Sequence, residues 1–286
     1  MKIGFIGTGV MGASMAGYLT GDLYVYNRTK HKARGLLDKG AIWCDSPAAL
    51  VQEVDIVFTM LGYPDDVREM YLGETGLIAN GKSGQIMIDC TTSSPELAAR
   101  IAEEALEKGI AILDAPVSGG DIGAKNGTLS TMVGGDAAAF LTVEPLLQAF
   151  SSSVSYFGLA GSGQHTKMAN QIAIASGMIG VAESLHYAKS AGLDVERVLE
   201  TIAKGAAGSW SLSNLAPRML SGDFKPGFYT HHFLKDMKIA LQEAEKMEIK
   251  LPGLALAYSL YEALSDDEKM EDGTHTIIHY YENDKE

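Results

Sequence analysis

Short apolar segments alternate with amphipathic segments through the first half of the chain. The apolar segments occupy residues 3–6, 23–26, 55–60, 85–89 and 111–115, followed by 128–133 and 154–157. Between two of them, Leu97, Ile101 and Ala105 recur at helical spacing, and Ser94 and Pro95 before them suit an N-cap and a first helical position. Strand and helix patterns in alternation predict a mostly parallel sheet that is covered by helices on both faces.

The pattern changes near Gly161, after which every segment has helical periodicity. Residues 163–191 form one long predicted helix whose apolar positions cover nearly its whole circumference. A helix that is apolar on all sides is buried, either in a domain core or in a subunit interface. Further helices are predicted at residues 194–204, 209–220, 230–246, 252–264 and 274–281. The sequence therefore predicts an α/β domain with a doubly wound sheet over residues 1–161, and an all-helical domain over residues 162–286 that begins with the long helix.

Composition narrows the classes of function that this chain can have. It contains 23 basic and 36 acidic side chains in 286 residues, so the formal net charge is -13. Such a chain repels nucleic-acid phosphates and anionic lipid surfaces. No stretch has the length of a membrane span without polar residues, and the N-terminus lacks the features of a signal peptide. The two cysteines, Cys44 and Cys90, make no disulfide framework, so we expect a cytoplasmic protein. From the charge and the lack of a membrane span, we expect it to bind neither nucleic acid nor membrane.

A glycine-rich segment follows the first predicted strand and opens a predicted helix. It matches the pattern G-x-G-x-x-G with Gly7, Thr8, Gly9, Val10, Met11 and Gly12. In that context the glycines permit a tight turn, and the amides at the helix N-terminus bind the pyrophosphate of a dinucleotide. The alternative is a glycine-rich turn that binds no ligand. We expect these six residues to bind a dinucleotide cofactor.

The end of the second predicted strand indicates which dinucleotide is bound. NAD-binding sites place an acidic residue there, which bonds the 2′-hydroxyl of the ribose. This chain has Asn27, Arg28 and Thr29 instead, which can donate hydrogen bonds or pair with a 2′-phosphate. NADP is therefore predicted in preference to NAD. The alternative is that Arg28 is only a solvated charge at a turn.

Four further motifs occur along the chain. Residues 114–120 read DAPVSGG, followed by GA at 123–124 and GTL at 127–129, and residues 161–171 read GSGQHTKMANQ. Residues 224–228 read FKPGF with KD at 235–236, and residues 89–95 read DCTTSSP. Together they resemble motifs of the β-hydroxyacid dehydrogenases, which include 3-hydroxyisobutyrate dehydrogenases, tartronate semialdehyde reductases and glyoxylate or succinic semialdehyde reductases. The resemblance implies an NADP-dependent oxidoreductase with a Rossmann-type first domain, assembled as a homodimer or homotetramer.

Residue chemistry and this resemblance assign the substrate and catalytic residues. Ser118, Gly119 and Gly120 supply a hydroxyl and consecutive amides that suit a carboxylate, with an ordinary β-turn as the alternative. Lys167 lies one turn into the long apolar helix, where a lysine is unusual unless it has a partner or a task. The resemblance assigns Lys167 to proton transfer and Asn170, one turn later, to the substrate oxygen. A snorkelling surface lysine is the alternative for Lys167.

The resemblance also implies roles for residues in three other segments. Lys235 is expected near the nicotinamide and the substrate carboxylate, where it would contact both cofactor and substrate, unless it is a solvated helix lysine. Thr92 and the strand end formed by Met60 and Leu61 are expected to line the cofactor. These residues complete the predicted site.

We therefore expect hydride transfer between NADP and a small β-hydroxyacid or its semialdehyde, of the 3-hydroxyisobutyrate, tartronate semialdehyde or succinic semialdehyde type. Two alternatives remain open: an imine reductase of similar architecture, against which Lys167 argues, and a non-catalytic NADP-binding module. The chain is too short for the large helical domain of a 6-phosphogluconate dehydrogenase. His275 and His279 have i,i+4 spacing that could hold a metal, but no carboxylate ligand accompanies them, so no metal is predicted.

Overall fold

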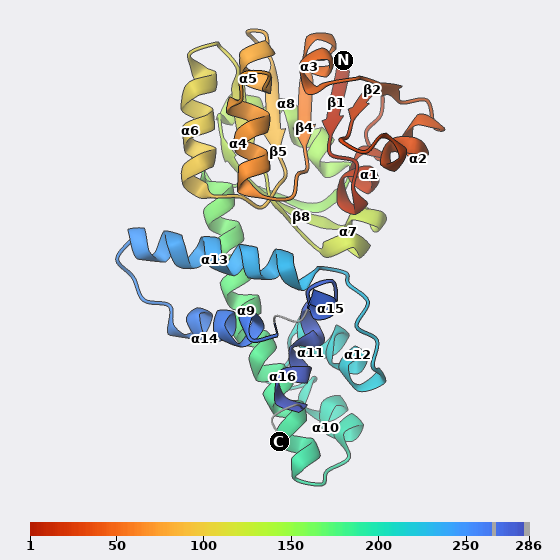
Figure 1. Ribbon diagram of the computed structural model, residues 1–286, viewed down its shortest axis with the longest axis vertical. Helices are drawn as coiled ribbons and strands as arrows, with labels where there is room; N and C mark the ends of the chain where they lie inside the picture. Colours follow the sequence, from red (N-terminus) through yellow and green to blue (C-terminus); the bar gives the residue numbers. More distant parts are fainter. Residues whose placement is uncertain (265–266, 283–286) are drawn as a thin grey trace. The chain divides into compact units, whose positions relative to one another are not determined.

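The computed structural model describes residues 1–264 and 267–282, which form two compact units (Figure 1). The first unit comprises Met1–Lys167 and the second Met168–Glu286. The division falls inside the helix α9 (Ser162–Ser190), which has 29 residues. Among the described residues, no helix combines the length and the apolar composition that crossing a membrane requires.

Within residues 1–167, all of which are described, nine strands form one sheet in the order β3-β2-β1-β4-β5-β6-β8-β7, with β9 paired to β8. The strands from β1 to β6 pair in parallel, whereas β8 is antiparallel to both β6 and β7. Their bounds are β1 (Lys2–Ile6), β2 (Asp22–Tyr26), β3 (Ile42–Trp43), β4 (Ile56–Thr59), β5 (Ile86–Asp89), β6 (Ala111–Asp114), β7 (Val117–Ser118), β8 (Leu129–Gly135) and β9 (Ser151–Tyr156).

Helices cover both faces of this sheet, because successive side chains of its buried strands point to opposite faces. Val57 packs in an apolar core with residues of α3 to α6, whereas its neighbours Ile56 and Phe58 pack in a second core with residues of α1 and α8. Figure 1 shows α4 to α6 side by side along one face. The helices of this unit are α1 (Val10–Ala16), the 3-10 helix η1 (Lys30–Ala33), α2 (Arg34–Leu37), α3 (Pro47–Glu53), α4 (Pro64–Leu72), α5 (Leu77–Asn80), α6 (Pro95–Leu106), α7 (Gly120–Asn126) and α8 (Ala137–Gln148).

Side-chain caps fix where several of these helices begin. The Oγ of Ser94 accepts a hydrogen bond from the Leu97 amide, and Pro95 is the first residue of α6, as the sequence predicts. Ser46 and Asp136 cap α3 and α8 in the same way. The caps satisfy amides that the first helical turn leaves without a partner.

The second unit has only helices as its described elements, and it has its own apolar core. In that core Met178 and Ala182 of α9 pack with Phe233 and Met237 of α13 and with Tyr261 of α14. The helices after α9 are α10 (Val195–Ile202), α11 (Trp210–Asn214), α12 (Ala216–Ser221), α13 (Thr230–Lys246), α14 (Pro252–Glu262), α15 (Asp267–Met270), the 3-10 helix η2 (Thr274–Ile277) and α16 (Ile278–Glu282).

The structure differs from the sequence prediction in several elements. The short strands β3 and β7 were not predicted, because two residues are too few to show a period. The helix predicted over 209–220 is two helices, with a break at Leu215 before Pro217. Two alternatives were predicted for the burial of α9. Burial on all sides within a domain core is wrong, since Ala173, Gly177 and Gly180 are exposed in the single chain, whereas burial in a subunit interface stays a prediction.

Candidate active site

The predicted cofactor residues of the first unit lie at one edge of its sheet. Parallel strands end at the same edge, and the glycine segment, Asn27, Met60 and Thr91 follow the ends of β1, β2, β4 and β5. The strand order reverses between β1 and β4, because β2 and β3 lie on one side of β1 while β4 to β6 lie on the other. Doubly wound sheets bind their ligands at such a switch point.

The three glycines of the loop after β1 differ in what surrounds them. Gly7 has φ +94, and a Cβ there would collide with the carbonyl oxygen of Met60. A Cβ on Gly12 would collide with the carbonyl oxygen of Gly7, so this residue allows α1 to pack against the loop. Gly9, the N-cap of α1, has no described atom within 4 Å of a Cβ position. The chain therefore leaves open space at Gly9, where backbone must approach the pyrophosphate.

A polar atom beside that open space supports the fit of a dinucleotide. Thr8 is buried, and its Oγ1 has no hydrogen-bond partner among the described residues. A buried hydroxyl without a partner is rare in a folded protein. The loop residues from Gly7 to Gly12 fit a pyrophosphate, whose oxygens would accept hydrogen bonds from the backbone amides at the start of α1 and from the Thr8 hydroxyl. The amides of Gly7 and Thr8 already donate to Tyr26 and Asn27.

The end of β2 binds the glycine loop through Asn27. Its Oδ1 accepts the Thr8 amide at 3.0 Å, and its Nδ2 donates to the Thr29 carbonyl oxygen at 2.9 Å. Arg28 is exposed, with 81% of its side chain accessible, and pairs with Asp66 of α4 at 3.2 Å. Asn27 therefore fixes the loop, whereas Arg28 is accessible for an anion at the position of the ribose clamp.

The ends of β4 and β5 are joined by hydrogen bonds. The Oγ1 of Thr91 accepts the Leu61 amide at 2.8 Å. The Oδ1 of Asp89 accepts the Thr91 amide at 3.1 Å and the Thr59 hydroxyl at 2.8 Å. Met60, Leu61 and Thr92 are partly accessible. The predicted cofactor-lining residues thus lie on two loops that are bonded to each other.

Lys167 is buried, with 5% of its surface accessible, so a surface lysine is excluded. The first turn of α9 before it is fixed to the end of β6 by Asp114, whose carboxylate accepts the amides of Gly161 and Gln164, each at 2.8 Å. Burial raises the pKa of Asp114 to about 6, against these two bonds, which lower it. The α9 helix therefore begins at the edge of the sheet where the cofactor loops lie.

The segment predicted to bind a carboxylate follows β6. Ser118 ends β7, and Gly119 and Gly120 have φ values of +129 and +62, which a residue with a side chain rarely adopts. Ser118 and Gly120 are partly accessible, and Gly119 is exposed. The hydroxyl and the backbone amides of this turn are thus available to a ligand.

In the second unit a chain of polar contacts links Asn170 to Lys235. Asn170 donates from Nδ2 to the Oε1 of Gln171 at 2.8 Å, and Gln171 donates from Nε2 to the Oδ2 of Asp236 at 2.6 Å. Lys235 pairs with the other carboxylate oxygen of Asp236 at 3.1 Å. Gln171 and Asp236 are buried, so they orient both predicted site residues.

His232 lies on α13, one turn before Lys235. Burial lowers the pKa of His232 to about 4, and the neighbouring His231 and Lys235 act in the same direction. The imidazole is therefore neutral at pH 7, and Lys235 supplies positive charge at this turn of α13.

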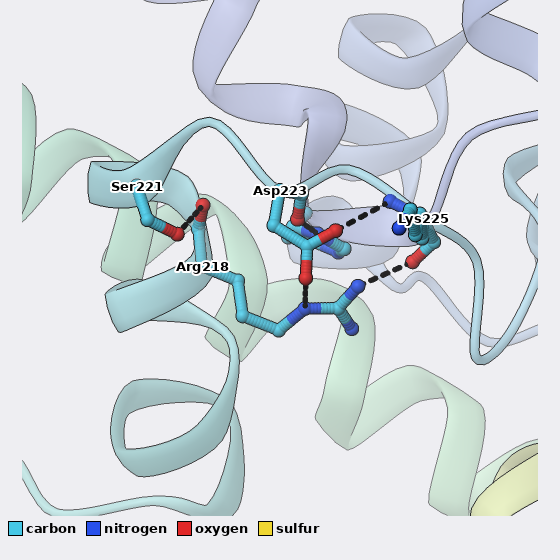
Figure 2. Close-up of polar contacts among 5 residues, drawn as sticks. Arg218, Ser221, Asp223 and Lys225 are labelled. Atoms are coloured by element: carbon cyan, nitrogen blue, oxygen red, sulfur yellow. Dashed lines mark hydrogen bonds and ion pairs between the residues drawn. The ribbon is translucent and has the colours of Figure 1, made fainter.

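The segment over 224–228, part of the C-terminal motif, is fixed by a cluster of polar contacts (Figure 2). Arg218 donates from Nε to Asp223 at 3.1 Å and from an Nη to the Lys225 carbonyl oxygen. His275, which is buried, contacts the Asp223 carbonyl oxygen through Nε2 at 2.7 Å and stacks on Phe224. His275 therefore has a structural contact. Among the residues whose side chains the structure describes, 1–264 and 269–282, no cluster of metal-ligating side chains occurs.

The structure thus brings the predicted residues together in two groups. The first unit holds the glycine loop, the ends of β2, β4 and β5, the Ser118 turn and Lys167, and the second holds Asn170 and Lys235. Sequence reasoning assigned no role to Asp114, Gln164, Gln171 and Asp236, although all four lie inside the motifs. Their signal in the sequence was that each is a polar residue inside a motif to which no ligand contact was assigned.

The sequence of this chain matches two family models and is similar to known dehydrogenases and reductases. Residues 2–158 match a family model described as the NAD binding domain of 6-phosphogluconate dehydrogenase, and residues 161–281 match one described as NAD-binding of NADP-dependent 3-hydroxyisobutyrate dehydrogenase. The chain is 47% identical to an Arabidopsis thaliana protein named 'Probable 3-hydroxyisobutyrate dehydrogenase-like 1, mitochondrial', over 97% of this chain and 84% of that one. It is 38% identical to the 2-hydroxy-3-oxopropionate reductase of Escherichia coli, over 91% and 90%.

The chain belongs to the β-hydroxyacid dehydrogenase family. A solved structure of the same kind, the 3-hydroxyisobutyrate dehydrogenase of Mycobacterium tuberculosis with L-serine, has a TM-score of 0.89 and 29% identity, over 97% of this chain and 98% of that one. The fold class predicted from the sequence is confirmed, and so is the enzyme class. The protein is an NAD(P)-dependent oxidoreductase that acts on a hydroxyl group or the corresponding carbonyl.

Proposed function

We propose that this enzyme transfers a hydride between NADP and a small β-hydroxyacid or its semialdehyde, with Lys167 as the proton donor in reduction and the proton acceptor in oxidation. The burial of Lys167 is the observation that supports it most directly. Burial is uncommon for a lysine, and it holds the amine away from bulk water, in a place where it can exchange a proton with a bound substrate. Lys167 lies one helical turn after a segment bonded to the loop that contains Thr91 and Ser93.

The proposed residues divide the reaction between them. The nicotinamide, when bound, supplies the hydride to the carbonyl carbon. The Nζ of Lys167 gives a proton to the carbonyl oxygen as negative charge develops there, and the neutral amine accepts it in the reverse direction. Asn170 holds the same oxygen through its amide, while the contact with Gln171 fixes the orientation of that amide.

Recognition of a carboxylate is assigned to the Ser118 turn and to Lys235. The Ser118 hydroxyl and the amides of Gly119 and Gly120 can donate to carboxylate oxygens. Lys235, already paired with Asp236, contributes positive charge from the second unit. The positive φ values of both glycines support a turn whose amides are available for an anion.

Preference for NADP is part of the proposal. Asn27 is the first residue after β2, where an acidic side chain would select NAD, and it is committed to Thr8 and Thr29. Arg28 is accessible beside it and would pair with the 2′-phosphate after releasing Asp66.

The substrate type is tested with the whole protein and a panel of carbonyl compounds. For reduction, the panel contains glyoxylate and the semialdehydes of methylmalonate, tartronate and succinate. A cyclic imine tests the alternative of an imine reductase. For oxidation, the substrates are 3-hydroxyisobutyrate and L-serine. We expect NADPH consumption with at least one carboxylate-bearing aldehyde and none with the imine. Reduction of the imine alone, or no turnover of any hydroxyacid or aldehyde, would contradict the proposal.

A homodimer or homotetramer remains part of the proposal. The exposed face of α9 presents Gly177 and Gly180, and no described atom lies within 4 Å of a Cβ position at either. Small residues allow a second helix to approach closely, which supports a contact between two copies.

The cysteines Cys44 and Cys90 are buried and form no disulfide in the described part of the chain, which supports a reducing compartment such as the cytoplasm.

A further inference from the structure

Gln164 connects the start of α9 to the loop between β5 and α6. Its side chain is completely buried. The Oε1 accepts the Ser93 amide at 3.0 Å, and the Nε2 donates to the Thr91 carbonyl oxygen at 2.7 Å. Both ends of the amide are thus bonded to backbone groups on either side of Thr92.

The backbone around Gln164 is fixed as firmly as its side chain. The amide of Gln164 donates to the Oδ2 of Asp114 at 2.8 Å. A Cβ on Gly163 would collide with the carbonyl oxygens of Met132 and Asp114, so the first turn of α9 lies directly on the end of β6 and the middle of β8. Gln164 therefore projects from a turn that cannot shift without disturbing the sheet.

The loop that Gln164 holds is bonded in turn to the end of β4. Thr91 accepts the Leu61 amide through its hydroxyl at 2.8 Å and donates its own amide to Asp89 at 3.1 Å. A continuous path of hydrogen bonds thus runs from Leu61 through Thr91 to Gln164. Lys167 follows Gln164 by three residues, which is one turn of α9.

We propose that Gln164 is a positioning residue, which holds the Thr91–Ser93 loop in a fixed place relative to Lys167. The inference rests on the proposed function, in which Lys167 delivers the proton, and on the expectation that Thr92 of this loop lines the cofactor. Hydride and proton must reach the two ends of one carbon–oxygen bond, so the two groups that supply them need a fixed separation. A glutamine with an acceptor and a donor on one planar group fixes the loop at two points.

The test compares Gln164→Met with Gln85→Met. Gln85 is a second buried glutamine, at the opposite end of β5, and its Nε2 donates to the carbonyl oxygens of Val51 and Val54, each at 2.7 Å. Gln164→Met removes two buried hydrogen bonds, and Gln85→Met removes two buried hydrogen bonds and the bond that its Oε1 accepts from the Lys82 amide at 2.6 Å. Both retain the side-chain length, but only Gln164→Met releases the Thr91–Ser93 loop.

Two measurements separate positioning from general destabilisation. Hydrogen exchange followed by mass spectrometry should show faster exchange in the peptide over residues 90–94 for Gln164→Met and not for Gln85→Met. Single-turnover hydride transfer at saturating NADPH should fall about 10- to 100-fold in Gln164→Met, because small misplacements of reacting groups have effects of that size. NADPH affinity should change by less than about threefold, because the pyrophosphate residues of the glycine loop are untouched.

Gln164→Glu provides a conservative variant that also serves if the methionine variant does not fold. A protonated carboxyl reproduces the acceptor and the donor of the amide, whereas the ionised form turns an oxygen toward the Thr91 carbonyl oxygen. Burial and the carboxylates of Asp114 and Asp89 raise the pKa of the introduced group, while Lys167 opposes them. The hydride-transfer rate of Gln164→Glu relative to the unmodified enzyme should therefore recover as the pH falls.

Three results would overturn the proposal: a transfer rate in Gln164→Met equal to that in Gln85→Met, faster loop exchange without a slower transfer, or a pH-independent ratio for Gln164→Glu. Failure of the proposed function is recognised separately, because the unmodified enzyme would then turn over no hydroxyacid or aldehyde. In that case equal exchange of residues 90–94 in the two methionine variants still overturns the role of Gln164.

Discussion

At the scale of single residues, the proposed preference for NADP depends on Arg28. Its partner in the structure is Asp66, at 3.2 Å, and the pair is largely solvated on the arginine side. Exposed ion pairs contribute little free energy, so Asp66 competes weakly with a phosphate dianion. Arg28 is therefore available to the cofactor despite having a protein partner.

We predict that Arg28→Ala weakens NADPH binding about tenfold and leaves NADH binding within about twofold, since a hydrogen bond to a charged group contributes roughly 1.5–3 kcal/mol. Fluorescence titration of both reduced cofactors measures this. Arg68→Ala is the matched control. Like Arg28, Arg68 is an exposed arginine that pairs with an aspartate of α4, in this case Asp65 at 3.3 Å. An equal loss of NADPH and NADH affinity, or a loss in Arg68→Ala, would show that Arg28 does not select NADP.

At the scale of elements, the start of α9 depends on a buried carboxyl. Burial raises the pKa of Asp114 from 3.8 to about 6 in the folded enzyme, while the unfolded chain keeps the lower value. Between these pH values the folded state binds more protons than the unfolded state. The contribution of Asp114 to the free energy of unfolding therefore falls as pH rises through about 4 to 6, by about 3 kcal/mol in total.

We predict that the stability difference between the unmodified enzyme and Asp114→Asn depends on pH. The unmodified enzyme should have its largest advantage near pH 4 and lose about 3 kcal/mol of it by pH 7, because asparagine does not titrate. Urea unfolding at several pH values measures both proteins under the same conditions. A constant difference, or one that grows with pH, would contradict the raised pKa.

The elements also show how far the sequence predicts the structure. The parallel strands and α13 follow from apolar runs and helical periodicity, because burial dictates those patterns. The strand β7, which positions Ser118, has only two residues and pairs with β8 through tertiary contact. The exposed stripe of α9 was not predicted either, since small residues such as Ala173 count as apolar whether or not a neighbour covers them.

The site is predictable from the sequence to a similar extent. Motifs locate the glycine loop, the Ser118 turn and Lys167. They do not show that the Asn27 side chain accepts a hydrogen bond from the Thr8 amide. Nor do they show that Gln164 accepts one from the Ser93 amide, 71 residues earlier in the chain. Such pairs depend on how the strand ends meet, which no local pattern records.

At the scale of the whole molecule, the residues of the proposed site are divided between the two units. The first unit contains the glycine loop, the Ser118 turn and Lys167, and the second contains Asn170 and Lys235 with their buried partners. The net charge of -13 does not oppose an anionic substrate, because the proposed contacts are local amides and lysines. The central claim of this account is that Lys167 transfers the proton.

Single-turnover hydride transfer in Lys167→Ala, beside a direct titration of NADPH, tests that claim most directly. The substrate is whichever aldehyde the unmodified enzyme reduces, and Lys189→Ala is the control, because Lys189 lies on the same helix with its Nζ paired to Glu282 at 2.9 Å. We predict a rate about 10²- to 10⁴-fold lower in Lys167→Ala, the usual contribution of an acid–base group, with NADPH affinity close to unchanged and no effect in Lys189→Ala. A folded Lys167→Ala variant with full activity and intact NADPH binding would contradict the account.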